Sequence, residues 1–119
     1  MTKIKIISLD ETDNIIIQIG NRKFEAMLSM ALYNIKEGEE YNGELSFYMF
    51  GGFELQIADN ESYDITHIEN YSYIITGKMI DSETIDVGFP ITSEWLEDYS
   101  YLIGQYVTCK IDRLEVNFL

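Results

Sequence analysis

His67 and Cys109 are the only histidine and the only cysteine of this 119-residue chain, and they carry the side chains most used for nucleophilic catalysis and metal binding. A structural zinc site needs about four Cys or His ligands and a catalytic one usually three, so these two residues supply neither. A Ser–His or Cys–His nucleophile pair would have to use His67, which lies in the polar segment NESYDITHIENY. We expect His67 to be a surface residue and Cys109, with its apolar flanks, to be a small core residue.

Carboxylates are the abundant reactive groups of the sequence. The densest oxygen cluster, Asp59, Asn60, Glu61 and Asp64, has ligands of the kind that Ca²⁺ takes, but the residue order and central glycine of an EF-hand are missing. A two-carboxylate hydrolase would need a pair at a defined separation, which no sequence pattern indicates. P-loop, dinucleotide-binding and zincin motifs are also missing from the sequence. We therefore predict a chain that is not an enzyme and has no catalytic residue, metal site or cofactor.

Charge is unevenly distributed along the chain, which has 21 acidic and 8 basic residues and a net charge of −13. Residues 1–36 hold four acids and five bases, whereas residues 37–109 hold fifteen acids and one base, Lys78. Self-repulsion of this size opposes compaction, but salt screens it over about 8 to 10 Å, so a fold tolerates it on the surface. Solubility alone is the simplest explanation of the acidity.

Aromatic residues, among them Tyr48, Phe50, Phe53, Tyr99 and Tyr101, are interleaved with the acids in the middle of the chain. Proteins that bind nucleic acids follow the phosphates with Lys and Arg and stack bases on aromatic rings. This segment offers rings but almost no base, so we expect no direct binding of nucleic acid. Tyrosines at the surface beside acids would instead form a patch that binds a basic protein.

The longest stretch without a base runs from Glu37 to Gly77 and supplies the residues that we predict to bind such a partner. They are Glu39, Glu40, Glu44, Asp59, Glu61, Asp64, Glu69, Tyr63 and Tyr71. The first functional hypothesis is a small acidic inhibitor that blocks a basic, nucleic-acid-binding protein, in the manner of an immunity protein to a nuclease toxin or a nucleic-acid mimic. It requires the acidic side chains to converge on one face.

Two other functions stay open. One is a non-catalytic accessory or assembly domain, a homo-oligomer or a subunit of a complex, which pairs through an exposed edge strand. The segment KIKIISL from Lys3 and the final segment QYVTCKIDRLEVNFL from Gln105 are the candidate edges. The other is a barrel that binds a small molecule or carbohydrate with tyrosines at its mouth.

Most of the chain alternates apolar and polar residues, the pattern of half-buried β-strands. It predicts a three-stranded meander in residues 3–28, strands in 43–50, 53–58, 71–80 and 84–91, and an extended final segment that changes phase at Asp112-Arg113. Only SEWLEDYSYLIG reads as a helix, with Ser93 as N-cap, apolar residues at α-helical spacing and Gly104 after its end. A weaker helical turn in MLSMALYNI is an alternative to a longer third strand.

Seven to eight short strands with one short helix predict a mainly β fold, a small antiparallel barrel or a strongly bent sheet. The comparison with oligonucleotide/oligosaccharide-binding barrels is loose, because their helix normally lies between the third and fourth of five strands. No linker or repeat divides the chain, which predicts a single domain over residues 1–119. The opening MTKIKIISLD is too short in apolar residues for a signal peptide or a membrane span, so we expect a cytoplasmic protein without membrane contact.

Overall fold

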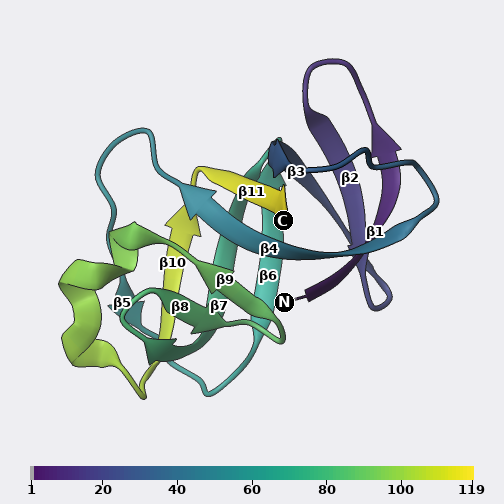
Figure 1. The fold of residues 1–119 in the computed structure, drawn as a ribbon. Helices are drawn as coiled ribbons and strands as arrows, with labels where there is room; N and C mark the ends of the chain where they lie inside the picture. The colour runs from purple at the N-terminus through teal and green to yellow at the C-terminus, as the bar shows by residue number, and fades with distance from the viewer. Residues whose placement is uncertain (1) are drawn as a thin grey trace.

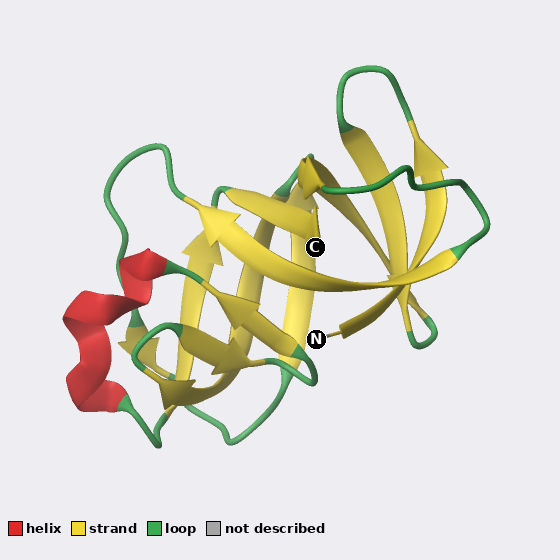
Figure 2. Cartoon of the chain, viewed as in Figure 1, coloured by secondary structure: helices red, strands yellow, loops and turns green. Residues whose placement is uncertain are grey.

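The structure is a computed structural model that describes residues 2–119 as one continuous sheet of eleven strands with a single short helix (Figure 1). The strands are β1 (Thr2–Leu9), β2 (Asn14–Ile19), β3 (Arg22–Ala31), β4 (Glu40–Tyr48), β5 (Gln56–Ile57), β6 (Asp64–Glu69), β7 (Ser72–Asp81), β8 (Thr84–Asp86), β9 (Pro90–Thr92), β10 (Tyr106–Ile111) and β11 (Arg113–Phe118). The helix is a 3₁₀ helix, η1 (Glu94–Leu102), drawn red at one end of the molecule in Figure 2. The predicted mainly β fold with one short helix and a strongly bent sheet is confirmed, but the sheet has eleven strands and not the seven to eight that we expected, because short pairs such as β8 and β9 count separately.

The first three strands form the predicted meander. The turn between β1 and β2 is organised by Asp10, whose carboxylate accepts hydrogen bonds from Thr12 and from the backbone of Asn14. The bond from the Thr12 hydroxyl is the main cause that lowers the pKa of Asp10. Gly20 supplies the positive φ of 61° that the tight turn between β2 and β3 needs. These contacts are local, which is why the sequence pattern finds them.

Five strands close into a ring, which we call the ring region. β1 pairs with both β2 and β4, and β11 runs parallel to β3 and antiparallel to β4, so the order β1-β2-β3-β11-β4 returns to β1. Residues 49–111, from the end of β4 to the end of β10, continue the sheet beyond β4 as β9, β8, β7 and β10, with β5 and β6 alongside; we call them the extension. In Figure 1, β1 and β2 of the ring lie at the right, β5, β8 and β10 of the extension lie at the left, and β4 runs between the two.

The ring has the five strands of an oligonucleotide/oligosaccharide-binding barrel. The likeness stops there, because residues 32–39 between β3 and β4 contain no helix and the sheet runs on past the ring instead of ending with it. The whole is therefore not a true barrel but a bent sheet with a closed portion.

Several details differ from the sequence-based expectations. The prediction of the two edge strands is wrong, because β1 and β11 each pair with a strand on both sides. The strands at the edges of the sheet are β5 and β6. The segment TIDVGFPI is two strands, β8 and β9, which turn back on each other at Gly88, where φ is 110°. Segment FELQIA forms only the two-residue β5, and MLSMALYNI extends β3 rather than forming a helical turn.

One hydrophobic cluster contains buried side chains from both regions, including Ile4 and Ile17 of the ring and Ile75 and Ile85 of the extension. Cys109 lies in this cluster at 5% exposure, and burial raises the pKa of its thiol to about 12. The prediction of a core cysteine is confirmed. In the described part of the chain, no helix has the length and apolar character needed to cross a membrane.

Candidate protein-binding surface

The helix η1 starts where the sequence predicts, at a serine cap. Ser93 has extended backbone angles (φ −166°, ψ 143°), and its Oγ accepts a hydrogen bond of 3.2 Å from the backbone N–H of Trp95. The same hydroxyl donates to the carbonyl oxygen of Phe47 at 3.1 Å. Because Phe47 belongs to β4, the cap also fixes the beginning of the helix against the sheet.

The face that η1 presents follows from its three residues per turn. Leu96 and Leu102 are buried and Tyr99 is half-buried, so positions three apart point to the core. The expected α-helical spacing would also have placed Ile103 on that face, but Ile103 is 46% exposed, so this part of the prediction is wrong. The helix is kinked at Tyr99, where φ is −111° and ψ is 21°.

Aromatic rings from η1, from the end of β4 and from the connection between β4 and β5 form a continuous series of contacts. From one end of the series to the other, the rings are Phe50, Tyr48, Trp95, Phe53, Tyr99 and Tyr101. The centroids of neighbouring rings are 5.7 to 6.5 Å apart. Several pairs are edge-to-face or tilted, as aromatic pairs prefer. The Tyr99 hydroxyl donates to the carbonyl oxygen of Phe53 at 3.2 Å, which ties the connection to the helix. The two end rings, Phe50 and Tyr101, are 68% and 75% exposed.

Carboxylates surround the helix end of this chain of rings. Glu83 comes from the turn between β7 and β8, and its carbonyl oxygen accepts a 2.9 Å hydrogen bond from the backbone N–H of Ser93. A side-chain hydrogen bond between Glu97 and Glu83 is the main cause that raises the pKa of Glu97, followed by partial desolvation and repulsion from neighbouring carboxylates. Within residues 2–119, Glu83, Glu94, Glu97 and Asp98 have no basic side chain within 4 Å.

We call these rings and carboxylates together the aromatic–acidic surface. Its members are Tyr48, Phe50, Phe53, Trp95, Tyr99, Tyr101, Glu83, Glu94, Glu97 and Asp98. Exposed rings provide contact area at a low cost in side-chain entropy, and flanking carboxylates select a positively charged partner. No group of three or more His, Cys, Asp or Glu side chains in the described residues is placed to hold a metal ion.

One arginine of the chain already contacts this surface. The Arg113 guanidinium carbon lies 5.0 Å from the ring centroid of Tyr48 and 5.2 Å from that of Phe50. Its Nη2 is 2.6 Å from the Glu115 carboxylate, and the nearby Asp112 carboxylate accepts a 2.9 Å hydrogen bond from the backbone N–H of Phe50. The site therefore holds a guanidinium by ring stacking and by a carboxylate at once.

The family model described as "Uncharacterised conserved protein UCP019853" matches residues 1–119, the whole chain. The chain belongs to this family. No curated protein and no solved structure matches it. The description of the family states no activity. A function for this UCP019853 member is therefore inferred from its own residues.

The sequence-predicted partner residues of this UCP019853 member lie at three places. The first group is Glu39 just before β4, Glu40 at its first residue and Glu44 in its middle. Asp59, Glu61, Tyr63 and Asp64 lie in and after the β5–β6 connection, and Glu69 and Tyr71 lie at the β6–β7 turn. The first and last residues of β6, Asp64 and Glu69, are about 17 Å apart at 3.3 to 3.4 Å per residue. The predicted acids therefore come from separate strands and turns of the sheet.

Some of these predicted residues already have partners within the chain. Glu40 faces Lys5 across the β1–β4 pair, and its carboxylate is 3.9 Å from the Lys3 ammonium. The Tyr63 hydroxyl is 3.2 Å from that of Tyr106, and this hydrogen bond is the main cause that raises the pKa of Tyr63. Tyr71 is half-buried, and burial raises the pKa of its phenol.

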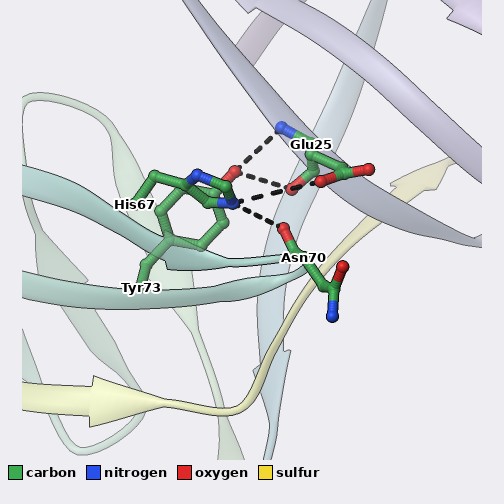
Figure 3. A network of polar contacts seen from close by, with 4 residues as sticks. All are labelled: Glu25, His67, Asn70 and Tyr73. Carbon is green, nitrogen blue, oxygen red and sulfur yellow. Dashed lines mark hydrogen bonds and ion pairs between the residues drawn. The ribbon is translucent and has the colours of Figure 1, made fainter.

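His67 contacts a backbone oxygen and a carboxylate rather than a nucleophile. Its Nε2 is 2.8 Å from the carbonyl oxygen of Asn70 and 4.0 Å from the Glu25 carboxylate, and its ring stands 5.0 Å from that of Tyr73 (Figure 3). The Tyr73 hydroxyl accepts from the Glu25 N–H at 2.8 Å and donates to the Glu25 carbonyl at 2.7 Å. In the described residues His67 has no hydrogen bond to a serine, threonine or cysteine side chain, and this cluster joins β6 and β7 to β3.

The aromatic–acidic surface is a grouping that the sequence analysis did not select. Tyr48, Phe50, Phe53 and Tyr99 stood out as rings interleaved with acids, but the length of the base-free stretch directed the choice to residues before Gly77. The signal for the helix part was present in SEWLEDYSYL, where rings and three acids follow a helix cap. Its contact with residues 48–53 is a tertiary fact with no pattern in the sequence.

Proposed function

We propose that the chain is a small acidic inhibitor that binds the basic, nucleic-acid-binding surface of another protein, as an immunity protein to a nuclease toxin or a nucleic-acid mimic would. The aromatic–acidic surface is the observation that carries this proposal. Rings at the centre and charges at the margin are the composition of protein-binding surfaces. The fit to a basic partner comes from carboxylates that have no basic side chain within 4 Å in residues 2–119.

Such an inhibitor would act by occupying a surface rather than by chemistry. Complementary charges speed the association of two proteins to about 10⁸ M⁻¹s⁻¹ or more at low salt, and this rate falls steeply with ionic strength. The proposal places the chain in the cytoplasm, where a partner would be met in a reducing environment; the single buried thiol of Cys109 suits that compartment.

The test starts with three baits: the unaltered chain, the double variant Glu83→Gln/Glu94→Gln and the matched variant Asp59→Asn/Glu61→Gln. Each variant removes two exposed charges, the first from the aromatic–acidic surface and the second from the β5–β6 connection. We expect the unaltered and matched baits to retain a basic protein from the cell lysate and the first variant to lose it. The purified partner should then lose nucleic-acid binding when the chain is added.

Two outcomes would reject the proposal. One is a partner that still binds its nucleic acid while bound to the chain. The other is an association rate that stays constant between low and physiological salt, because a charge-driven encounter is screened over about 8 to 10 Å.

An assembly role is the second candidate, and the observation that favours it is the edge strand β6. In the described residues β6 pairs only with β7, and Ile68 on it is 41% exposed, so its second edge is open to another strand. Sedimentation of the pure chain distinguishes the two roles. A stable oligomer that a proline at Thr66 disrupts would favour assembly, and a monomer would favour the inhibitor.

A further inference from the structure

A cavity of about 320 Å³ opens within the aromatic–acidic surface. Its walls include Tyr48 from β4, Glu83 from the β7–β8 turn, Glu94 and Trp95 from η1, and Glu115 from β11. The cap contacts of Ser93 hold these walls together, because Ser93 bonds to both Phe47 and Glu83 through its side chain and backbone. The cavity is therefore a fixed feature of the fold.

The walls combine negative charge with aromatic rings. Glu83 and Glu94 are exposed and lie more than 4 Å from any basic side chain of residues 2–119. The rings of Tyr48 and Trp95 meet at 86° with centroids 6.5 Å apart, so one presents its face where the other presents its edge. A cation over an aromatic face is attracted by the ring quadrupole, and adjacent carboxylates add to that attraction.

Arg113 shows which cation these walls suit. It is an arginine of this chain that already stacks on Tyr48 at 5.0 Å while its guanidinium pairs with Glu115, another wall of the cavity. Glu115 is thereby paired with a base, whereas Glu83 and Glu94 have no basic side chain within 4 Å in residues 2–119. Next to Glu83, the pKa of Glu97 is raised mainly by a hydrogen bond with the Glu83 side chain, and repulsion from Glu83, Glu94 and Asp98 adds to this.

We propose that the cavity binds the guanidinium of an arginine side chain on the partner protein, between the rings of Tyr48 and Trp95 and the carboxylates of Glu83 and Glu94. This inference rests on the proposed function and specifies its anchor. Arginine fits better than lysine, because a guanidinium is planar, stacks on aromatic rings and forms paired hydrogen bonds with carboxylates, whereas an ammonium is a compact and strongly hydrated charge.

Trp95 is the only tryptophan of the chain and a wall of the cavity, so its fluorescence reports occupancy directly. The probes are three acetylated and amidated tripeptides, Gly-Arg-Gly, Gly-Lys-Gly and Gly-citrulline-Gly, titrated into the full chain. Citrulline has the shape of arginine without its charge. We expect a saturable change with the arginine peptide, and affinities weaker by about threefold for lysine and about tenfold or more for citrulline, since tenfold corresponds to one lost charge contact of about 1.4 kcal/mol.

The variants locate the site. Glu83→Gln/Glu94→Gln should weaken the arginine peptide by about tenfold or more, and the matched Asp59→Asn/Glu61→Gln should change its affinity by less than about twofold. Equal responses to arginine and citrulline, or equal losses in the two variants, would overturn the arginine site.

The two proposals fail separately. If the partner is lost with Glu83→Gln/Glu94→Gln but no arginine peptide alters Trp95 emission, the inhibitor stands and the arginine site is rejected. If the peptide binds with the expected specificity but the chain leaves the captured protein free to bind nucleic acid, the arginine site stands and the inhibitor is rejected.

Discussion

The ring region and the extension use the same strand chemistry but differ in how they treat charge. The ring, residues 2–48 and 113–118, holds nine acids and six bases, and the ion pairs Lys3–Glu40 and Arg113–Glu115 lie within it. The extension, residues 49–111, holds eleven acids and two bases, and its acids make no ion pair within the described residues. Two acids of the ring are therefore paired with Lys or Arg, whereas no acid of the extension is paired within the described residues.

The two regions indicate that an electrostatic function in an acidic protein depends on where its acids lack basic neighbours. Net charge by itself explains solubility, and the ring shows that acids close to bases in the fold lose much of their outward field. The extension keeps its field and adds exposed rings beside it. The two regions are nevertheless joined, because Tyr73 of β7 binds the backbone of Glu25 in β3.

The largest expected loss of stability comes from adding a side chain at a glycine that lies close to a neighbouring strand, and each region contains one such glycine. A Cβ at Gly77 in the extension would lie 1.9 Å from the carbonyl oxygen of Asp86, whereas one at Gly43 in the ring would lie 2.9 Å from both the Asn117 oxygen and the Ile4 side chain. We expect Gly77→Ala to cost about 3 kcal/mol or more of unfolding free energy and Gly43→Ala about 1 to 2, because an overlap at 1.9 Å requires a larger shift of paired strands than contacts at 2.9 Å. Urea unfolding of both variants measures this, and equal losses would contradict it.

The next effect breaks the link between the regions. Tyr73→Phe removes the hydroxyl that satisfies both backbone groups of Glu25, at a cost of about 1 to 3 kcal/mol, while the edge-to-face contact with Phe24 remains. Tyr99→Phe is the control. Its hydroxyl makes one bond of 3.2 Å to Phe53 within the extension, so we expect a loss of about 1 kcal/mol or less.

Tyr73 also gives a pH signature. Burial raises its pKa from 10.0 to about 12, so the folded state favours the protonated phenol. This stability is fully present below pH 10 and is lost as the pH rises toward 12, by about 2.7 kcal/mol at most, at about 1.36 kcal/mol per pH unit. The Cys109 thiol adds a loss that begins near pH 9 in the parent chain and in Tyr73→Phe alike. Parallel stability curves for the two proteins between pH 10 and 12 would contradict the assignment to Tyr73.

The smallest effects compare one charged residue from each region. Lys3→Ala removes an ion pair whose side chains are 71% and 53% exposed, so we expect it to lower stability by no more than about 0.5 kcal/mol. Glu97→Gln removes a carboxylate from a repulsive group and should raise the thermal midpoint at pH 7. Because the pKa of Glu97 is raised above 4.5, its carboxylate in the parent chain becomes protonated as the pH falls toward 4.5. The gain in thermal midpoint should therefore shrink over this range. A lower midpoint for Glu97→Gln at pH 7 would show that these carboxylates do not repel.

Features that depend on residues close together in the sequence could be predicted from the order of the amino acids alone. Alternation of apolar and polar residues predicted most strands, the Ser93 cap predicted the start of η1, and the apolar flanks of Cys109 predicted its burial. The prediction missed the ends of short strands such as β5, because two residues carry no periodicity. It also assumed α-helical spacing in a helix that has three residues per turn.

Only the tertiary structure decided which charges are compensated and which rings meet. Closure of the ring places the β1 lysines beside the beginning of β4, and docking of η1 brings residues 95–101 against residues 48–53, more than forty positions earlier in the chain. The physical reason is that strand parity fixes only which face a side chain points to, whereas the burial of apolar surface across the whole chain selects which faces come together.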